Sequence, residues 1–123
     1  MKSRWMTCNE TRYFYLDYAN FGGDVAGLLA EVNAVHHVVL QQPLGSLLEL
    51  VDVRGTDVST EFLNLLKVNA ILARPHLRKV AVVGVTGLRR TFAEMVARFS
   101  GQELTLFEDE EAAKEWLVRN DEK

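Results

Sequence analysis

The chain has 123 residues, 48% of them hydrophobic, and a formal net charge of -3 at pH 7. This length suits one globular domain with a single sizeable core. We expect that domain over residues 1–123, with an N-terminal extension over 1–10 and a C-terminal tail over 120–123. The mildly acidic charge argues against a dedicated nucleic-acid binder, because such proteins normally present a basic surface.

Cysteine usage and hydropathy indicate a reducing compartment and no membrane span. Cys8 is the single cysteine, which excludes an intramolecular disulfide and gives no metal-ligand spacing. Lys2 and Arg4 are not followed by the apolar segment of a signal peptide, and no run approaches the roughly 18 apolar residues of a transmembrane helix. We therefore predict a cytoplasmic protein with no transmembrane segment.

The first predicted elements are a strand and a helix. Residues 13–18 (YFYLDY) are rich in aromatic side chains, as strands are, and residues 19–24 form the turn that follows. Asp24 is placed to cap a helix that stops near Gln42 and Pro43. Its apolar stripe consists of Val25, Leu28, Leu29, Val32, His36 and Val39.

A second strand and helix follow. Residues 47–53 are nearly continuous in apolar side chains, and the strand ends at residues 54–57. The next helix begins at Val58 and stops at Arg74, because the residue before a proline disfavours helical dihedrals. Its main stripe is Phe62, Leu65, Leu66, Asn69 and Leu72, with Leu63, Val68 and Ile71 as further apolar residues outside it.

The last two units complete the pattern. Residues 80–83 are an unbroken apolar run that suits a strand at the sheet centre, and residues 84–87 form the turn into a helix over Leu88 to Phe99. Gly101 ends that helix, residues 103–107 alternate as a short strand, and Ala112, Ala113, Trp116 and Leu117 mark a closing helix. The sequence therefore predicts an α/β fold of four βα units with right-handed crossovers and a mostly parallel open sheet.

Four segments, in this order and spacing, resemble the small bacterial SpoIIAA-like proteins of the STAS type (sulphate transporter and anti-sigma-factor antagonist). They are LVDVRGTDVS, RPHLRKVAVVGVTGLRR, FSGQELTLF and EDEEAAKEWL, and the last two include the pattern Phe107, Ala113, Trp116 and Leu117. The resemblance runs from about Tyr13 to Leu117. It implies a (βα)4 superhelix related in topology to the CRAL-TRIO lipid-binding fold, no cofactor and no established enzyme activity.

The resemblance also suggests a regulatory surface. In phosphorylated STAS switches a serine follows an aspartate at the start of the helix after the second core strand, within an Asp-Ser-Ser/Thr-Gly signature. The matching stretch here is DVSTE, residues 57–61, so a valine intervenes and a glutamate replaces the glycine. The candidate phosphorylation or partner surface is Asp52, Asp57, Ser59 and Thr60. The alternative is that Ser59 or Thr60 only caps the helix.

Other motifs carry less chemistry. The turn after the third strand lacks the Gly-Lys-Ser/Thr ending of a P-loop, but its backbone N–H groups and arginines form a candidate anion site: Thr86, Gly87, Arg89 and Arg90. The alternative is a tight turn with solvated arginines. His36 and His37 point about 100° apart on a helix, which is a poor arrangement for a metal, and we predict no metal site. We expect His36 to be a half-buried, hydrogen-bonded ring, His76 to lie in a loop, and Asp52 and Arg54 to form a structural ion pair.

Three classes of function remain, in order of preference. The first is a non-enzymatic regulatory or protein-interaction module with an unknown protein partner. The second is a carrier or binder of a small lipophilic or anionic ligand, which the CRAL-TRIO kinship and the extra apolar residues of helix 58–73 favour. Those residues equally suit a homodimer face. The third is an enzyme, although no Ser-His-Asp, Cys-His or paired-carboxylate pattern is visible in the sequence.

Overall fold

The structure is a computed structural model, and it describes residues 1–57, 59–85 and 104–119. Its strands are β1 (Arg4–Cys8), β2 (Thr11–Asp17), β3 (Leu47–Asp52), β4 (Leu77–Val83) and β5 (Thr105–Phe107). Its helices are α1 (Val25–Val39), α2 (Thr60–Ala73) and α4 (Glu110–Val118), with a short 3-10 turn, η1 (Arg74–His76), between α2 and β4. The third predicted helix, over Leu88 to Phe99, lies outside the described residues, so the count of four βα units is not established.

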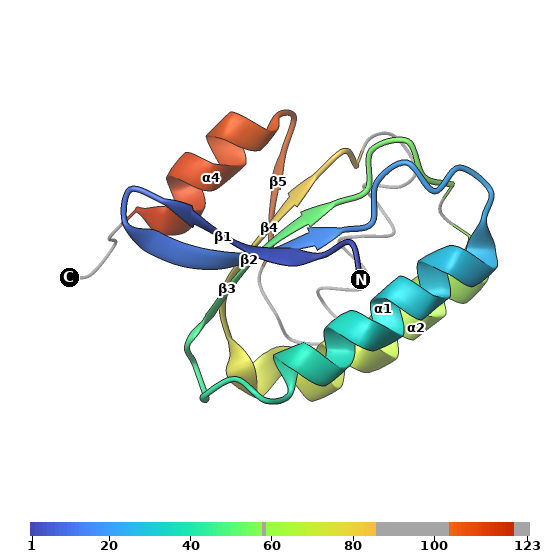
Figure 1. The fold of residues 1–123 in the computed structure, drawn as a ribbon, viewed down its shortest axis with the longest axis horizontal. Helices are drawn as coiled ribbons and strands as arrows, with labels where there is room; N and C mark the ends of the chain where they lie inside the picture. Colours follow the sequence, from blue (N-terminus) through green and yellow to red (C-terminus); the bar gives the residue numbers. More distant parts are fainter. Residues whose placement is uncertain (58, 86–103, 120–123) are drawn as a thin grey trace.

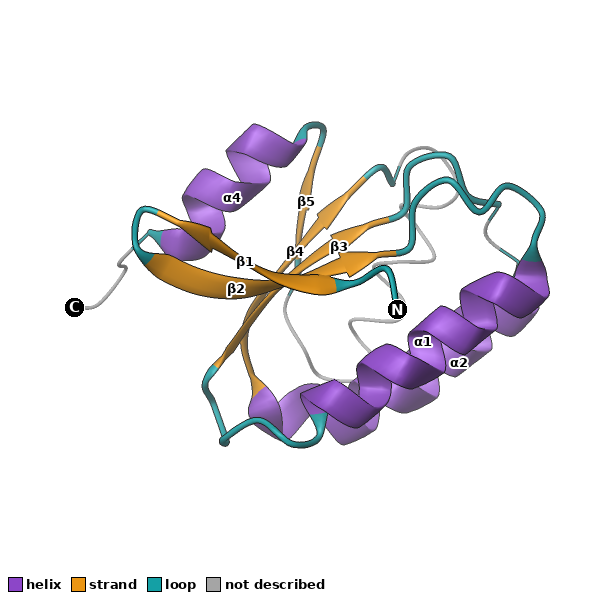
Figure 2. Ribbon diagram, in the orientation of Figure 1, coloured by secondary structure: helices purple, strands orange, loops and turns teal. Residues whose placement is uncertain are grey.

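The five strands form one open sheet in the order β1-β2-β3-β4-β5. β1 pairs with β2 antiparallel, and every later pair is parallel. Helices α1 and α2 lie side by side on one face of the sheet, and α4 covers the other face (Figure 1). Figure 2 shows the same three layers by element type. The predicted α/β class with a mostly parallel open sheet is confirmed.

The first strand was not predicted. Residues 4–8, placed in an N-terminal extension, instead form β1, which joins β2 through Asn9 and Glu10. Both turn residues have positive φ, 50° and 68°, a conformation that L-residues seldom adopt. Trp5 stacks on Phe14 with ring centroids 4.7 Å apart, and this contact fixes β1 to the body of the sheet.

Two apolar cores, one on each face, explain the continuous apolar runs of the sequence. Toward α1 and α2 the sheet presents residues that include Phe14, Leu16, Leu47 and Val53. Toward α4 it presents residues that include Tyr13, Tyr15, Leu48 and Leu50. Successive strand residues face opposite sides of the sheet, and helices cover both sides. Neither face therefore requires polar residues, and the strands can be apolar throughout.

The starts of α1 and α4 follow the sequence, whereas α2 begins at Thr60 rather than at the predicted Val58. Asp24, as predicted, caps α1: its Oδ1 accepts a hydrogen bond from the backbone N–H of Gly27 at 3.0 Å. Asp109 caps α4 through Ala112 at 2.8 Å. α1 ends at Val39 rather than near Gln42.

The predicted stripe of α2 is wrong at Leu72, whose residue is 53% exposed. The buried residues of this helix are Phe62 and Ala73. Successive residues of a helix point about 100° apart, so Leu72, which precedes Ala73, faces away from the buried side. Of the extra apolar residues, Val68 and Ile71 are also exposed, whereas Leu63 faces the interior space described below.

Candidate functional site

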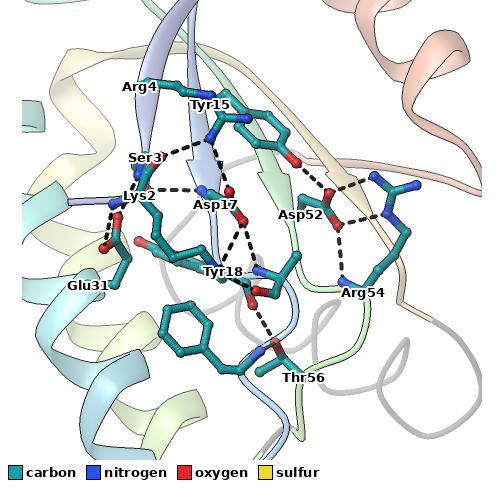
Figure 3. Close-up of polar contacts among 12 residues, drawn as sticks. Lys2, Ser3, Arg4, Tyr15, Asp17, Tyr18, Glu31, Asp52, Arg54 and Thr56 are labelled. Carbon is teal, nitrogen blue, oxygen red and sulfur yellow. Dashed lines mark hydrogen bonds and ion pairs between the residues drawn. The ribbon is translucent and has the colours of Figure 1, made fainter. Parts of the chain in front are cut away.

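A buried polar network closes the carboxyl ends of β2 and β3. At the end of β3, Asp52 is 1% exposed and accepts a hydrogen bond from the Tyr15 hydroxyl at 2.6 Å. The Arg54 guanidinium reaches both oxygens of the same carboxylate, with Nε 2.9 Å from Oδ1 and Nη2 2.7 Å from Oδ2 (Figure 3). Arg54 Nη2 also lies 3.1 Å from Glu110 Oε1, which ties the strand end to α4. The predicted ion pair between Asp52 and Arg54 is present.

These contacts decide the charge of the network. Burial by itself raises the pKa of Asp52, but the hydrogen bonds from Arg54 and Tyr15 outweigh it and hold that pKa below its ordinary value. Burial and the hydrogen bond to Asp52 raise the pKa of Tyr15, so its hydroxyl keeps its proton. Asp52 and Arg54 thus form an ion pair, and the side chains of Asp52, Arg54 and Tyr15 are hydrogen-bonded to one another.

A second buried carboxylate joins the N-terminus to α1. Glu31 accepts hydrogen bonds from the backbone N–H groups of Lys2, at 3.0 Å, and Ser3, at 2.7 Å (Figure 3). Ser3 Oγ in turn accepts from the backbone N–H of Asp17 at 2.9 Å. These bonds to its two oxygens, against the opposing effect of burial, lower the pKa of Glu31.

The predicted partner surface is divided by the structure. Asp57 and Thr60 are exposed at the start of α2, and Ser59 is half-buried between them. Ser59 Oγ accepts a hydrogen bond from the backbone N–H of Phe62 at 3.1 Å, which makes Ser59 the cap of the helix. Asp52 belongs to the buried network and not to this exposed segment. Phosphorylation of Ser59 or Thr60 stays a prediction.

The candidate anion site stays a prediction too. Thr86, Gly87, Arg89 and Arg90 lie outside the described residues. The turn that leads to them begins at Gly84, whose φ is +97° and where an added Cβ would lie 2.6 Å from Arg54 Cγ and 2.9 Å from Arg54 N. Only glycine fits there, because the backbone at the end of β4 passes directly against Arg54.

The most distinctive space in the described part of the chain is a cavity of about 150 Å³ between the sheet and the α1–α2 pair. Its walls are mostly apolar. Leu16, Val51, Val80 and Val82 contribute from the sheet, Val32 and Val35 from α1, and Phe62, Leu66 and Ala70 from α2. Figure 1 shows the helix pair and the strands that enclose it.

Four polar side chains interrupt these walls: Tyr18, His36, Glu49 and Asn69. Glu49 is 6% exposed and has no hydrogen-bonding or ion-pair partner among the described residues. Burial, with no compensating contact, raises its pKa to about 7. Asn69 Nδ2 is a buried donor without a partner in the part of the chain described. The cavity therefore combines apolar walls with unpaired polar groups.

The other two polar groups stay uncharged near neutral pH. Burial, followed by the charges of Glu49 and Glu31, raises the pKa of Tyr18 well above its ordinary value. Burial and the neighbouring His37 lower the pKa of His36. The hydrogen bond expected for His36 is not found among the described residues. His76, expected in a loop, lies in η1 with its Nδ1 2.6 Å from the Gln42 carbonyl oxygen.

Sequence reasoning missed the cavity. The signal for it was Glu49, a charged residue within the apolar run 47–53, which was counted only as part of the strand. Asn69, a polar residue in the apolar stripe of helix 58–73, is a weaker signal of the same kind, whereas Tyr18 carries none. Among the described residues, no group of three or more His, Cys, Asp or Glu side chains is placed to hold a metal ion. No described helix has the length and apolar character needed to cross a membrane.

Comparison with known proteins identifies the family. A family model described as SpoIIAA-like matches residues 15–118, a range that includes the cavity and β3 to β5. The chain belongs to the SpoIIAA-like family. A crystal structure of an uncharacterized protein from the DUF3478 family of Shewanella loihica, described as having a SpoIIAA-like fold, is similar to this SpoIIAA-like chain, with a TM-score of 0.65 and 14% identity. That likeness covers 94% of this chain and 92% of the other, and it shows the fold alone. Among curated proteins, none matches the sequence.

Proposed function

We propose that this SpoIIAA-like protein binds a small lipophilic ligand in the cavity between its sheet and the α1–α2 pair. The observation that carries the proposal is an apolar cavity of about 150 Å³ whose walls come from three strands and two helices. An apolar protein cavity of roughly this volume takes up a molecule of about the size of benzene. The expected ligand is therefore small, such as a monocyclic aromatic compound or a short branched chain.

The apolar walls of the cavity favour an occupant. The cavity is partly open to solvent, so its apolar walls are in contact with water until a ligand covers them. An apolar ligand restores contacts to wall residues such as Val51 and Phe62, and it brings its own apolar surface out of water. For a ligand of this size we expect a dissociation constant of about 1 mM, which corresponds to about 4 kcal/mol of binding free energy.

The regulatory or protein-interaction function, preferred on sequence grounds, rests on the STAS resemblance. The exposed positions of Asp57 and Thr60 agree with it, but Ser59 already has the role of a helix cap. Binding in the cavity rests on a space that the fold itself contains, so we place it first and keep the exposed start of α2 as a second candidate site.

The test is to titrate the protein with ethylbenzene and follow the core methyl signals by NMR. We expect saturable shifts in Val and Leu residues that line the cavity. Ala70→Phe places a ring where α2 borders the cavity, so it should abolish the shifts, whereas the matched control Ala30→Phe lies on the exposed side of α1 and should leave them unchanged. Equal binding by the parent protein and Ala70→Phe would contradict the proposal.

A further inference from the structure

Glu49 occupies an unusual position for a carboxyl group. It lies in the middle of β3, an interior strand, and is paired in register with Phe14 on β2 and Val80 on β4. Since alternate strand residues share a face, its side chain lies with those of Leu47 and Val51 under the helix pair. A carboxyl group in such surroundings costs several kcal/mol when ionised and unpaired.

Nothing in the described fold uses this carboxyl. Glu31, equally buried, accepts two backbone hydrogen bonds that hold the N-terminus in place. Glu49 makes no such contact, and a leucine there would extend the apolar core. The carboxyl therefore contributes no structural contact that accounts for it.

Two further polar groups from other elements open onto the same cavity. Tyr18 follows β2, and its hydroxyl makes no hydrogen bond among the described residues. Asn69 comes from α2, and its Nδ2 is the buried donor without a partner. A tyrosine hydroxyl and an amide nitrogen are donors, and so is Glu49 when protonated. Three segments thus present hydrogen-bond donors to one apolar space.

The charge of the cavity restricts what can bind these donors. Among the described residues, the titratable groups that line it are Tyr18, from the segment after β2, His36, from α1, and Glu49, from β3, while α2 contributes the amide of Asn69. An anionic ligand meets apolar walls and a carboxyl. A cationic ligand pairs with Glu49 but leaves the donors of Tyr18 and Asn69 without acceptors. An uncharged oxygen has two lone pairs, so one hydroxyl or carbonyl oxygen can accept hydrogen bonds from both Glu49 and Asn69.

We propose that Glu49 and Asn69 form the polar part of the cavity wall and that the ligand is a small uncharged molecule with one hydroxyl or carbonyl group on an apolar body. This assignment rests on the proposed function, since it names the class of ligand for the same cavity. Glu49 and Asn69 recognise the oxygen, and the apolar walls accommodate the rest.

The experiment compares four ligands of similar shape: benzyl alcohol, ethylbenzene, benzylamine and benzoate. Dissociation constants are measured by NMR titration at about pH 6, where a Glu49 with a pKa of about 7 is mostly protonated. The proteins are the parent, Glu49→Leu and Glu49→Gln. Comparing the ratio of two ligands' constants between variants cancels their different solubilities in water.

We expect Glu49→Leu to weaken the binding of benzyl alcohol by about tenfold relative to the binding of ethylbenzene, because one buried hydrogen bond to the ligand is lost. Glu49→Gln keeps hydrogen-bonding groups and should change the ratio by less than about threefold. The parent should bind benzyl alcohol more tightly than benzylamine or benzoate. An unchanged ratio in Glu49→Leu, or tightest binding of either charged compound, would overturn the assignment of the polar part of the cavity wall.

A second pair of variants, both in α2, tests the same assignment if the Glu49 substitution in β3 prevents folding. Asn69→Leu removes the unpaired donor of α2 and should also lower the benzyl alcohol preference, whereas Asn64→Leu, on the exposed side of the same helix, should not. Equal ratios in these two variants would likewise overturn the assignment. If the parent binds none of the four compounds, the proposed function itself fails, and this result differs from binding without preference.

Discussion

Two buried glutamates of this protein differ in what surrounds them. Glu31 accepts two backbone hydrogen bonds and has a lowered pKa, whereas Glu49 has no partner among the described residues and a pKa raised to about 7. Both are less than 10% exposed, so burial alone does not separate them. The difference teaches that a buried charge with full hydrogen bonding belongs to the architecture, while one without it marks a place where another molecule can complete the contacts.

The comparison extends to the two regions as wholes. The strand-end network of Asp52, Arg54 and Tyr15 has the composition of an active site, with a carboxylate, a guanidinium and a phenol in contact. Its groups are already paired with one another, and Asp52 is closed off from solvent. Among the described residues, the carboxyl of Glu49 in the cavity has no such partner. The four predictions below test this contrast.

The largest expected effect is on the pH dependence of stability. Because the folded-state pKa of Glu49 is raised above its ordinary value, the folded protein binds more protons there than the unfolded chain. The stabilising contribution of protonated Glu49 is fully present below about pH 4.5 and is lost as pH rises toward 7, by about 3 kcal/mol in total. Denaturant unfolding of the parent and Glu49→Gln across this range measures it.

Other groups act in the same experiment but in separable ways. The lowered pKa values of Asp52 and Glu31 add stability as pH rises through the acidic range, below the window of Glu49. The lowered pKa of His36 adds stability as pH rises toward 6.5, opposing Glu49. Since these groups are present in both proteins, the difference between parent and Glu49→Gln isolates Glu49. Parallel pH profiles for the two would contradict an unpaired buried carboxyl.

The next effect concerns the network. Arg54→Ala removes two of the hydrogen bonds to a carboxylate that stays buried, and we expect a loss of about 2 to 3 kcal/mol in the free energy of unfolding. The value is below that of a fully buried pair because the Arg54 side chain is partly exposed and Tyr15 still donates. Arg4→Ala, which breaks an exposed ion pair with Asp17, is the control and should cost less than about 1 kcal/mol. Equal losses of unfolding free energy in Arg54→Ala and Arg4→Ala would contradict the conclusion that the buried carboxylate of Asp52 depends on Arg54.

The same substitution, glutamate to leucine, should change the free energy of unfolding in opposite directions at the two sites. Glu31→Leu leaves the N–H groups of Lys2 and Ser3 unpaired and should destabilise the protein by about 2 kcal/mol. Glu49→Leu replaces an unpaired carboxyl by an apolar side chain and should stabilise it by about 1 to 2 kcal/mol at neutral pH. Chemical denaturation at about pH 7 measures both. Destabilisation by Glu49→Leu would mean that this carboxyl has a structural role.

The smallest expected effect on stability is at the start of α2. Ser59→Asp keeps a capping oxygen and adds a charge that the helix dipole favours, so the free energy of unfolding should change by less than about 1 kcal/mol. Ligand binding in the cavity should be unaffected. If this surface is a regulatory site, the same variant should weaken capture of a protein partner in a pull-down, with Ser46→Asp, on an exposed loop, as the control. An unchanged set of partners would count against regulation at Ser59.

How far the sequence leads differs between the fold and the site. The runs 47–53 and 80–83 predicted interior strands because a parallel sheet covered on both faces requires unbroken apolar residues, and the structure confirms both. β1 was missed because residues 4–8 are short and mixed in polarity, and they become a strand only by pairing with β2. Local propensity holds no information about such a partner.

The cavity could not be predicted, for a related reason. A void arises from how well the side chains of distant elements fill space, and Tyr18, Glu49 and Asn69 come to line one cavity only after the strands and helices have packed. The ion pair of Asp52 and Arg54, by contrast, is predictable, because residues two positions apart along an extended chain lie on the same side. Contacts within a few residues of sequence were predictable here, and the unpaired groups were not.

The added strand β1 has a consequence for solubility. β2 contains the consecutive buried residues Tyr13, Phe14, Tyr15 and Leu16, a segment with high strand propensity and no charge. Without β1 its backbone N–H and C=O groups would form an open edge of the kind that recruits strands from other molecules. The short strand Arg4–Cys8 instead takes that edge position and places the cation of Arg4 over the Tyr15 ring. These few N-terminal residues thus cover the backbone edge of an apolar, uncharged segment of the sheet and leave a strand with a charged residue at the edge.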